Sequence, residues 1–276
     1  MRPRPAPAPA PPARRTASAA EGDSRLFIAS LAKCFQVLEA LNTAGRAVGL
    51  TELALLSGID RSGVQRITHT LRVLGYLRQD PATRALRLSG RMLEFGHTVL
   101  ATNRLRERAQ PHLEALNRRT GETVNLMELE GDEIVYVARF ASVHAVSVDL
   151  HVGSRLPAFC TAAGRAILSR LDPAEAQARL KAARRSAMTA RTVTDLARLR
   201  ALLERARDDG YALNDQEAFV GDISVAAPLL DTHGQPLGAI NIAVPSPRWQ
   251  LDDVLARLVP ALLKTAAAVN REIRFL

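Results

Sequence analysis

The sequence predicts an α+β protein in which a helical N-terminal domain precedes a domain built on a mainly antiparallel sheet. Residues 50–76 repeat apolar side chains at helical spacing on either side of one glycine turn. Residues 123–140 and 224–244 instead contain paired runs with strand character around short turns. The charge also divides, because residues 1–110 hold 17 Lys and Arg against 8 Asp and Glu, whereas residues 111–276 hold 20 of each.

The composition limits the class of protein. The chain has 276 residues and is 47% hydrophobic, which is enough for two cores, and its 4% aromatic content argues against a base-stacking single-strand binder. Cys34 and Cys160 are too far apart in sequence to suggest a metal motif or a disulfide framework. No segment has the pattern of a membrane span or a signal peptide. We therefore expect a cytoplasmic protein with no metal and no membrane partner.

The first segments are a tail and a helix. Residues 1–23 are rich in Pro and Ala and lack core-forming side chains, so we expect a disordered tail that is passive or contacts an anionic partner through its arginines. Residues 24–41 place six side chains on one face of a predicted helix: Phe27, Leu31, Cys34, Phe35, Leu38 and Leu41. This helix would complete a three-helix core, with Cys34 as a small buried residue.

Residues 50–76 predict two helices joined by a tight turn. Thr51 is the expected cap of the first helix, and Gly58 would end it in a left-handed conformation. Asp60 would cap the second helix, which should continue to about Leu74.

The second helix has two contrasting faces. Val64, Ile67, Leu71 and Leu74 form a stripe expected to be buried. The opposite face contains no acid and carries Arg61, Ser62, Gln65, Arg66, His69 and Arg72. Arg and Gln side chains can bind base edges from a helix in the major groove, so the pair resembles a DNA-binding helix-turn-helix. The alternative is an ordinary amphipathic pair with a solvated face.

A basic hairpin should follow. Residues 76–80 and 85–89 alternate in polarity around a turn at 81–84. Arg84 and Arg87 would contact phosphate from this hairpin, which makes residues 24–90 a winged helix-turn-helix domain. Residues 91–108 are expected to form a linker helix whose apolar face packs on a second copy of the chain, because dimeric readers must fix their half-site spacing.

The remaining residues, 109–276, predict one domain of mixed structure. Helices are expected at 105–119, 161–171, 173–184, 195–209 and 251–275. Strands are expected at 123–129, 133–140, 146–150, 211–214, 224–230 and 237–244. We expect these helices to lie on one side of the sheet.

Several segments resemble the IclR family of bacterial transcriptional regulators. They include LTELALLSGIDRSGVQRITHTLRVLGYL, TGETVNLMELEGDEIVYVARF, VGSRLPAFCTAAGRAILSRL, GYALNDQEAFVGDISVAAPLLD and GQPLGAINIAVPSPR, and the likeness extends over residues 25–270. The resemblance implies a winged-helix domain, a linker helix and an effector domain with a GAF-like or profilin-like sheet. It also implies dimers, often assembled into tetramers, that respond to small organic or aromatic acids. The residues of several motifs are most similar to those of the family branch linked to aromatic-acid catabolism.

The same resemblance implies a ligand pocket. Its residues here would be Val148, Ala162, Ala163, Asn214, Ser224, Asn241 and Ala243. Asn214 stands where many family members have an acid, and Asn241 stands where many have a small hydroxyl residue. These two amides would change which ligand is accepted.

Two other functions are alternatives to a ligand-controlled regulator. His144, His151 and Cys160 could suggest an enzyme, but their spacing matches no known site, and no P-loop, G-x-S-x-G or G-x-G-x-x-G is present. We therefore expect no catalytic residue and no cofactor. The alternative is an architectural or ligand-independent DNA-binding protein with a degenerate effector domain. The expected partners are an operator duplex, a small organic or aromatic acid and a second copy of the chain, with RNA polymerase added if the protein is an activator.

Overall fold

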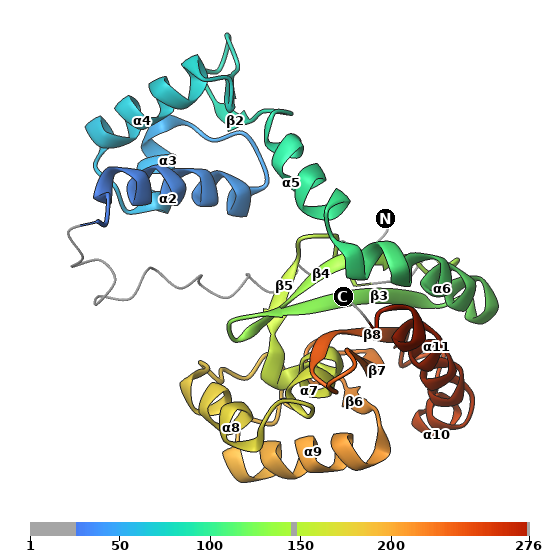
Figure 1. The fold of residues 1–276 in the computed structure, drawn as a ribbon. Helices are drawn as coiled ribbons and strands as arrows, with labels where there is room; N and C mark the ends of the chain where they lie inside the picture. Colours follow the sequence, from blue (N-terminus) through green and yellow to red (C-terminus); the bar gives the residue numbers. More distant parts are fainter. Residues whose placement is uncertain (1–25, 145–147, 275–276) are drawn as a thin grey trace. The chain divides into compact units, whose positions relative to one another are not determined.

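The protein is described by a computed structural model that covers residues 26–144 and 148–274. It divides into two compact units at the junction of Thr102 and Asn103. The first unit contains the helix-turn-helix and the second contains the large sheet (Figure 1). No helix in the described residues is both long enough and apolar enough to span a bilayer.

The N-terminal unit packs three helices against a short hairpin. The helices are α2 (Ala29–Ala44), α3 (Leu50–Ser57) and α4 (Arg61–Val73), and the hairpin is formed by β1 (Leu77–Gln79) and β2 (Leu86–Leu88). Its core contains Val37, Leu41, Leu53, Val64 and Leu71, which the hairpin covers with Leu77 and Leu86. The winged helix-turn-helix expected from the sequence is therefore present.

Local sequence signals explain the turn between α3 and α4. Gly58 ends α3 with φ of 68°, which glycine adopts at little cost. The Asp60 side chain accepts a hydrogen bond of 2.8 Å from the backbone N–H of Gly63 and so caps α4. The expected cap at Thr51 is wrong. Gly49 has the extended conformation of a cap residue, and α3 begins at Leu50 without a side-chain cap.

Several apolar residues expected in the core are instead exposed. Leu74 is 50% exposed, and on α2 the exposed fractions are 54% for Leu31 and 62% for Phe35. Thr68 takes the buried position beside Val64, with its hydroxyl donating to the Val64 carbonyl, while Ile67 is only partly buried. Leu31 and Phe35 of α2, and Leu74 at the end of α4, therefore remain uncovered within a single chain.

The segment predicted as one linker helix at 91–108 is split. Helix α5 (Met92–Ala101) ends before Asn103, and α6 (Arg104–Thr120) begins after it. Asn103 causes the break, because its side-chain oxygen accepts from the backbone N–H of Arg106 at 2.7 Å and so starts a new helix. Its amide group also donates to Glu128 at 2.7 Å, which ties the start of α6 to the sheet.

The C-terminal unit is built on a six-stranded antiparallel sheet with the order β5-β4-β3-β8-β7-β6. The strands are β3 (Thr123–Glu130), β4 (Glu133–Phe140), β5 (Arg155–Pro157), β6 (Ala212–Asp215), β7 (Asp222–Leu230) and β8 (Pro236–Pro245). The neighbouring strands β7 and β8 form a hairpin, as the Asp231–Gly234 turn predicted.

Helices cover both faces of this sheet, which corrects the expectation of one covered side. Figure 1 shows α6 and α11 (Val259–Glu272) on one face, and α7 (Ala162–Leu168), α8 (Pro173–Ala182) and α9 (Leu196–Asp209) on the other. The sequence carries the cause, because all seven residues from Ile223 to Leu229 are buried. A strand with one solvated face would alternate in burial instead.

Two further predictions are wrong. Residues 148–150 lie outside any strand, residues 145–147 lie outside the described part, and the edge strand is β5, which pairs with β4. Pro157 suits that edge because it has no N–H to donate. The closing helix is also interrupted. A π-helical segment, Val254–Leu258, separates α10 (Leu251–Asp253) from α11, where Pro260 cannot donate the usual helix bond.

Candidate functional site

Helix α4 presents a polar, basic face to solvent. All six of its residues predicted to bind DNA are exposed: Arg61, Ser62, Gln65, Arg66, His69 and Arg72. Among the described residues, no ion pair joins any of these three arginines to an acid. Their charges therefore remain available to an anionic partner.

A hollow of about 610 Å³ lies between α4 and the hairpin. It is lined by six of the eight predicted DNA-binding residues: Ser62, Gln65, Arg66, His69, Arg72 and Arg84. Arg61 and Arg87 are exposed outside it. The structure thus brings most of the predicted set onto one surface, although contact with DNA remains a prediction.

The hairpin holds arginines in unfavourable settings. Arg84 has φ of 59°, a left-handed conformation that costs a side-chain-bearing residue about 1–2 kcal/mol. Arg78 and Arg87 lie directly opposite each other in the β1–β2 register, where like charges repel. Arg78 was not among the predicted contacts. The hairpin therefore concentrates positive charge that a bound anion would neutralise.

The second site is a pocket on the face of the sheet covered by α7. Its volume is about 230 Å³, and all seven residues predicted to bind a ligand line it. Asn214, Ser224, Asn241 and Ala243 come from β6, β7 and β8, Ala162 and Ala163 from α7, and Val148 from the segment after β4. The shared register explains the convergence, because Thr123, Ala243, Ser224 and Asn214 are successive cross-strand partners.

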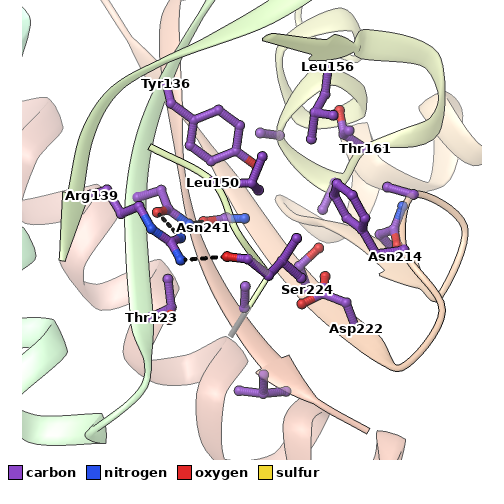
Figure 2. Close-up of a pocket in the computed structure, with 18 of the residues that line it drawn as sticks. Thr123, Tyr136, Arg139, Leu150, Leu156, Thr161, Asn214, Asp222, Ser224 and Asn241 are labelled. Carbon is purple, nitrogen blue, oxygen red and sulfur yellow. Dashed lines mark hydrogen bonds between the residues drawn. The ribbon is translucent and has the colours of Figure 1, made fainter. Parts of the chain in front are cut away.

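A chain of side-chain hydrogen bonds crosses the pocket floor. The guanidinium of Arg139 donates to Asn125 Oδ1 at 3.1 Å and to the Val148 carbonyl at 3.0 Å. Asn125 Nδ2 in turn donates to Asn241 Oδ1 at 2.7 Å. Figure 2 shows Arg139 and Asn241 on one side of the pocket, with Asp222 and Asn214 on the other.

Both polar atoms of the Asn214 side chain, which was predicted to bind a ligand, already form hydrogen bonds within the protein. Its amide nitrogen donates to the Cys160 carbonyl, and its oxygen accepts from the backbone N–H of Glu217 at 3.2 Å. These bonds connect β6 to the turn before α7 and to the loop at 216–221. Asn214 therefore positions the pocket wall with both of its polar atoms.

The loop at 216–221 forms part of that wall and is firmly attached. Glu217 makes a paired ion bridge with the buried Arg165, with N···O distances of 2.5 and 2.6 Å. The same carboxylate accepts from the backbone N–H of Val193 at 2.9 Å, and Thr192 donates to the Glu217 carbonyl at 2.7 Å. Phe219 and Val220 are thereby held at the pocket.

Charged groups missed by the sequence reasoning dominate the electrostatics of the pocket. Burial raises the pKa of the Asp222 carboxyl to about 7, although the charge of Arg139 lowers it. Burial and the neighbouring Asp222 also raise the pKa of Tyr136, so its phenol stays protonated. The available signal was a lone charge or amide on an otherwise apolar strand, as with Arg139 in IVYVARF and Asn125 in TVNLM.

The residues considered for an enzyme do not form a catalytic site. Cys160 is buried, its thiol lies 3.6 Å from the sulfur of Met188, and burial raises its pKa to about 12. Such a thiol is protonated near neutral pH and is a poor nucleophile. His144 and His151 are exposed, and the described residues contain no cluster of His, Cys, Asp and Glu that could hold a metal.

Comparisons with known proteins match both units. Residues 30–81 match the IclR helix-turn-helix domain, and residues 97–271 match the bacterial transcriptional regulator IclR C-terminal domain. The Pca regulon regulatory protein of Pseudomonas putida is 36% identical over 253 residues, which cover 91% of this chain and 86% of that protein.

Solved structures share the fold. A crystal structure of a regulator from Rhodococcus sp. RHA1 has a TM-score of 0.78 at 33% identity, over 90% of this chain and 98% of that one. An IclR homolog from Microbacterium hydrocarbonoxydans, crystallised in complex with 4-hydroxybenzoate, has a TM-score of 0.74 at 25% identity. That match covers 89% of this chain and 99% of the homolog.

Proposed function

The chain belongs to the IclR family of bacterial transcriptional regulators, and we propose that a small organic or aromatic acid bound on its sheet controls its binding to an operator. As a member of this family it is a DNA-binding regulator and not an enzyme. The observation that carries the proposal is the pocket containing Arg139, which provides a partly buried cation beside apolar walls. The complex of the Microbacterium homolog with 4-hydroxybenzoate supports an aromatic acid as the ligand.

DNA recognition is assigned to residues 24–90. Helix α4 would enter the major groove, where Gln65, Arg61, Ser62 and Arg66 face base edges or phosphate. Arg72, Arg84 and Arg87 would bind phosphate on either side, with His69 beside them. The proposed location of the protein is the bacterial cytoplasm, because a regulator must share the compartment of its operator DNA.

Residues 109–276 are assigned to effector binding and oligomerisation, with residues 91–108 between the two functions. The seven predicted pocket residues supply walls and amide groups, and Arg139 supplies the charge. Ligand binding would favour one arrangement of the effector domains and so alter the spacing of paired recognition helices. RNA polymerase becomes a partner if the protein activates transcription.

A second copy of the chain is the proposed partner of the exposed apolar faces on α2 and α5. Leu93, Phe95 and Val99 on α5 are 75%, 57% and 64% exposed, and Phe35 on α2 is 62% exposed. Large apolar side chains left this exposed on two helices of one unit are typical of an interaction surface. A helix-turn-helix protein that reads two half-sites needs such a surface to hold its two recognition helices at a fixed spacing.

Two substitutions test the DNA-binding assignment. Gln65→Ala should change which base is preferred at one operator position, at a cost of about 1–3 kcal/mol for the native site. Arg84→Gly should weaken binding to all duplexes alike and lower the salt slope by about one, while glycine tolerates the left-handed turn. Titrations of the DNA flanking the protein's own gene and of a scrambled duplex, at two salt concentrations, measure both effects.

The outcome separates two kinds of contact. A base-specific loss in Arg84→Gly would contradict the wing assignment. Equal and steeply salt-dependent binding of wild type to both duplexes would instead favour an architectural protein that contacts only phosphate.

A further inference from the structure

The pocket has a positive end that no acid of the described chain neutralises. Arg139 belongs to β4, and its guanidinium is held by Asn125 and by the Val148 carbonyl, both of which are neutral acceptors. These two bonds use two of its five N–H donors. No ion pair within 4.0 Å joins Arg139 to an acid among the described residues. The guanidinium is therefore oriented by neutral acceptors and has no acid in direct contact, although its charge reaches Asp222 and lowers the pKa of that carboxyl.

The opposite end of the pocket carries one carboxyl group. Asp222 begins β7, which is separated from β4 by strands β3 and β8. Arg139 is in register with Ala226 through Asn125 and Asn241, so Asp222 lies three strands away from Arg139 and four residues further along β7. Within the described residues, no hydrogen bond occupies the Asp222 carboxyl oxygens, and Figure 2 shows them beside Ser224 at the pocket.

The pocket that contains these two ends is small and has several apolar walls. Tyr136, Leu150, Leu156 and Phe219 line it. Its volume of about 230 Å³ is below the roughly 300–1,000 Å³ of pockets that take drug-sized ligands. A planar ring suits a small apolar pocket better than a flexible chain does, because a ring loses little conformational entropy when apolar walls hold it.

We propose that Arg139 binds the carboxylate of the effector and that Asp222 forms a hydrogen bond with a hydroxyl group at its other end, so the effector is a small hydroxylated aromatic monoacid. This inference rests on the proposed control of operator binding by an acid. It adds which chemical groups of the acid the protein recognises. Arginine presents paired donors that match a carboxylate. A hydroxyl group suits Asp222 in either protonation state, because it can both donate and accept.

The same arrangement rejects two related ligand classes. A neutral amide in place of the acid would leave the charge of Arg139 unpaired in a partly buried site. A dicarboxylic acid would place a second negative charge against Asp222, where like charges repel and one group must take up a proton. The pocket therefore selects for one negative charge at one end and a neutral hydrogen-bonding group at the other.

Calorimetry on the full-length protein with four probes tests the proposal. The probes are 4-hydroxybenzoate, benzoate, 4-hydroxybenzamide and terephthalate. Wild type should bind 4-hydroxybenzoate about tenfold more tightly than benzoate, and at least about tenfold more tightly than either the amide or the diacid. These comparisons use the unaltered protein, so they hold even if a variant fails to fold.

Substitutions then assign each preference to a residue. Arg139→Gln should weaken both monoacids about tenfold or more and remove the preference for acid over amide, and Arg139→Lys should restore part of it. Asp222→Ala should bring the ratio between 4-hydroxybenzoate and benzoate close to one without weakening benzoate. Arg205→Gln, a matched change on the exposed surface of α9, should leave all four affinities unchanged.

Operator titrations on the same samples separate this inference from the function on which it rests. In one outcome, 4-hydroxybenzoate changes operator affinity, but wild type binds the amide equally well or Arg139→Gln and Asp222→Ala keep the wild-type preferences. The assignment of the two ends of the pocket is then wrong, and regulation by an acid stands. If none of the monoacids binds wild type or changes operator affinity, both the inference and the proposed function fail.

Discussion

Asp222 is a carboxyl group whose ordinary pKa of 3.8 is raised to about 7 in the folded protein, mainly by burial. Arg139 and Tyr136 are the other ionisable groups that line the same pocket. Because the folded state holds the proton of Asp222 more tightly than the unfolded state does, this group stabilises the fold most below pH 3.8. That contribution is lost as the pH rises to about 7.

Asp222→Asn removes this titration and keeps the shape of the side chain. At about pH 8 the variant should be more stable than wild type by on the order of 1–2 kcal/mol, since each pKa unit corresponds to about 1.4 kcal/mol and water in the open pocket reduces the full effect. The gap should close as the pH falls towards 4. Thermal unfolding across this range measures it, with the exposed Asp208→Asn on α9 as control. A gap that stays constant with pH would show that Asp222 is ionised throughout.

At the scale of residues, the sequence predicted seven residues that line the pocket but not its two charged residues. All seven predicted ligand residues line one cavity, although their contact with a ligand remains a prediction. Arg139 and Asp222 were missed because their role depends on strand order, which brings residues 139 and 222 to one face. Asn214 was placed correctly, but only the folded chain shows that its amide bonds the Cys160 carbonyl and the Glu217 backbone.

Among the elements, the ion pair between α7 and the loop at 216–221 should be the most costly polar contact to break. Arg165 is 2% exposed at its side chain and Glu217 is 11% exposed. Arg165→Met leaves the Glu217 carboxylate buried without its partner, which should cost about 3–5 kcal/mol. Arg205→Met breaks the exposed pair with Asp209 on α9 and should cost less than about 1 kcal/mol. Urea unfolding of both variants measures the difference, and equal losses would mean that the buried pair contributes no more than a surface pair.

Elements with local signals could be predicted from the sequence, and those set by tertiary pairing could not. Asp60 and Asp195 cap their helices, and Gly58 and Gly210 end theirs in left-handed conformations, as expected. The edge strand β5 was missed because three residues around Pro157 carry no periodic pattern, and their strand character comes from pairing with β4. The break between α5 and α6 had a signal in Asn103, a good cap residue inside the segment predicted as a linker helix.

For the molecule as a whole, the exposed apolar faces of α2 and α5 predict a dimer. Val99→Glu should place a charge in this interface and halve the mass of the particle in solution, because a buried unpaired charge is strongly unfavourable. Leu55→Glu, at a residue of α3 that is 80% exposed, is the matched control and should keep the mass of wild type. Light scattering measures both. An unchanged mass for Val99→Glu would place the contact between copies elsewhere.

The central claim is that occupation of the pocket on the sheet changes the affinity of the helix-turn-helix for its operator. Linkage makes this claim measurable in both directions, because an acid that alters operator affinity must have its own affinity altered by the operator through the same factor. The most direct measurement is the dissociation constant of the operator with and without saturating 4-hydroxybenzoate, paired with that of the acid with and without operator. We predict the same change in both, by roughly 5- to 150-fold. An acid that binds the protein tightly and leaves operator affinity unchanged would contradict the account.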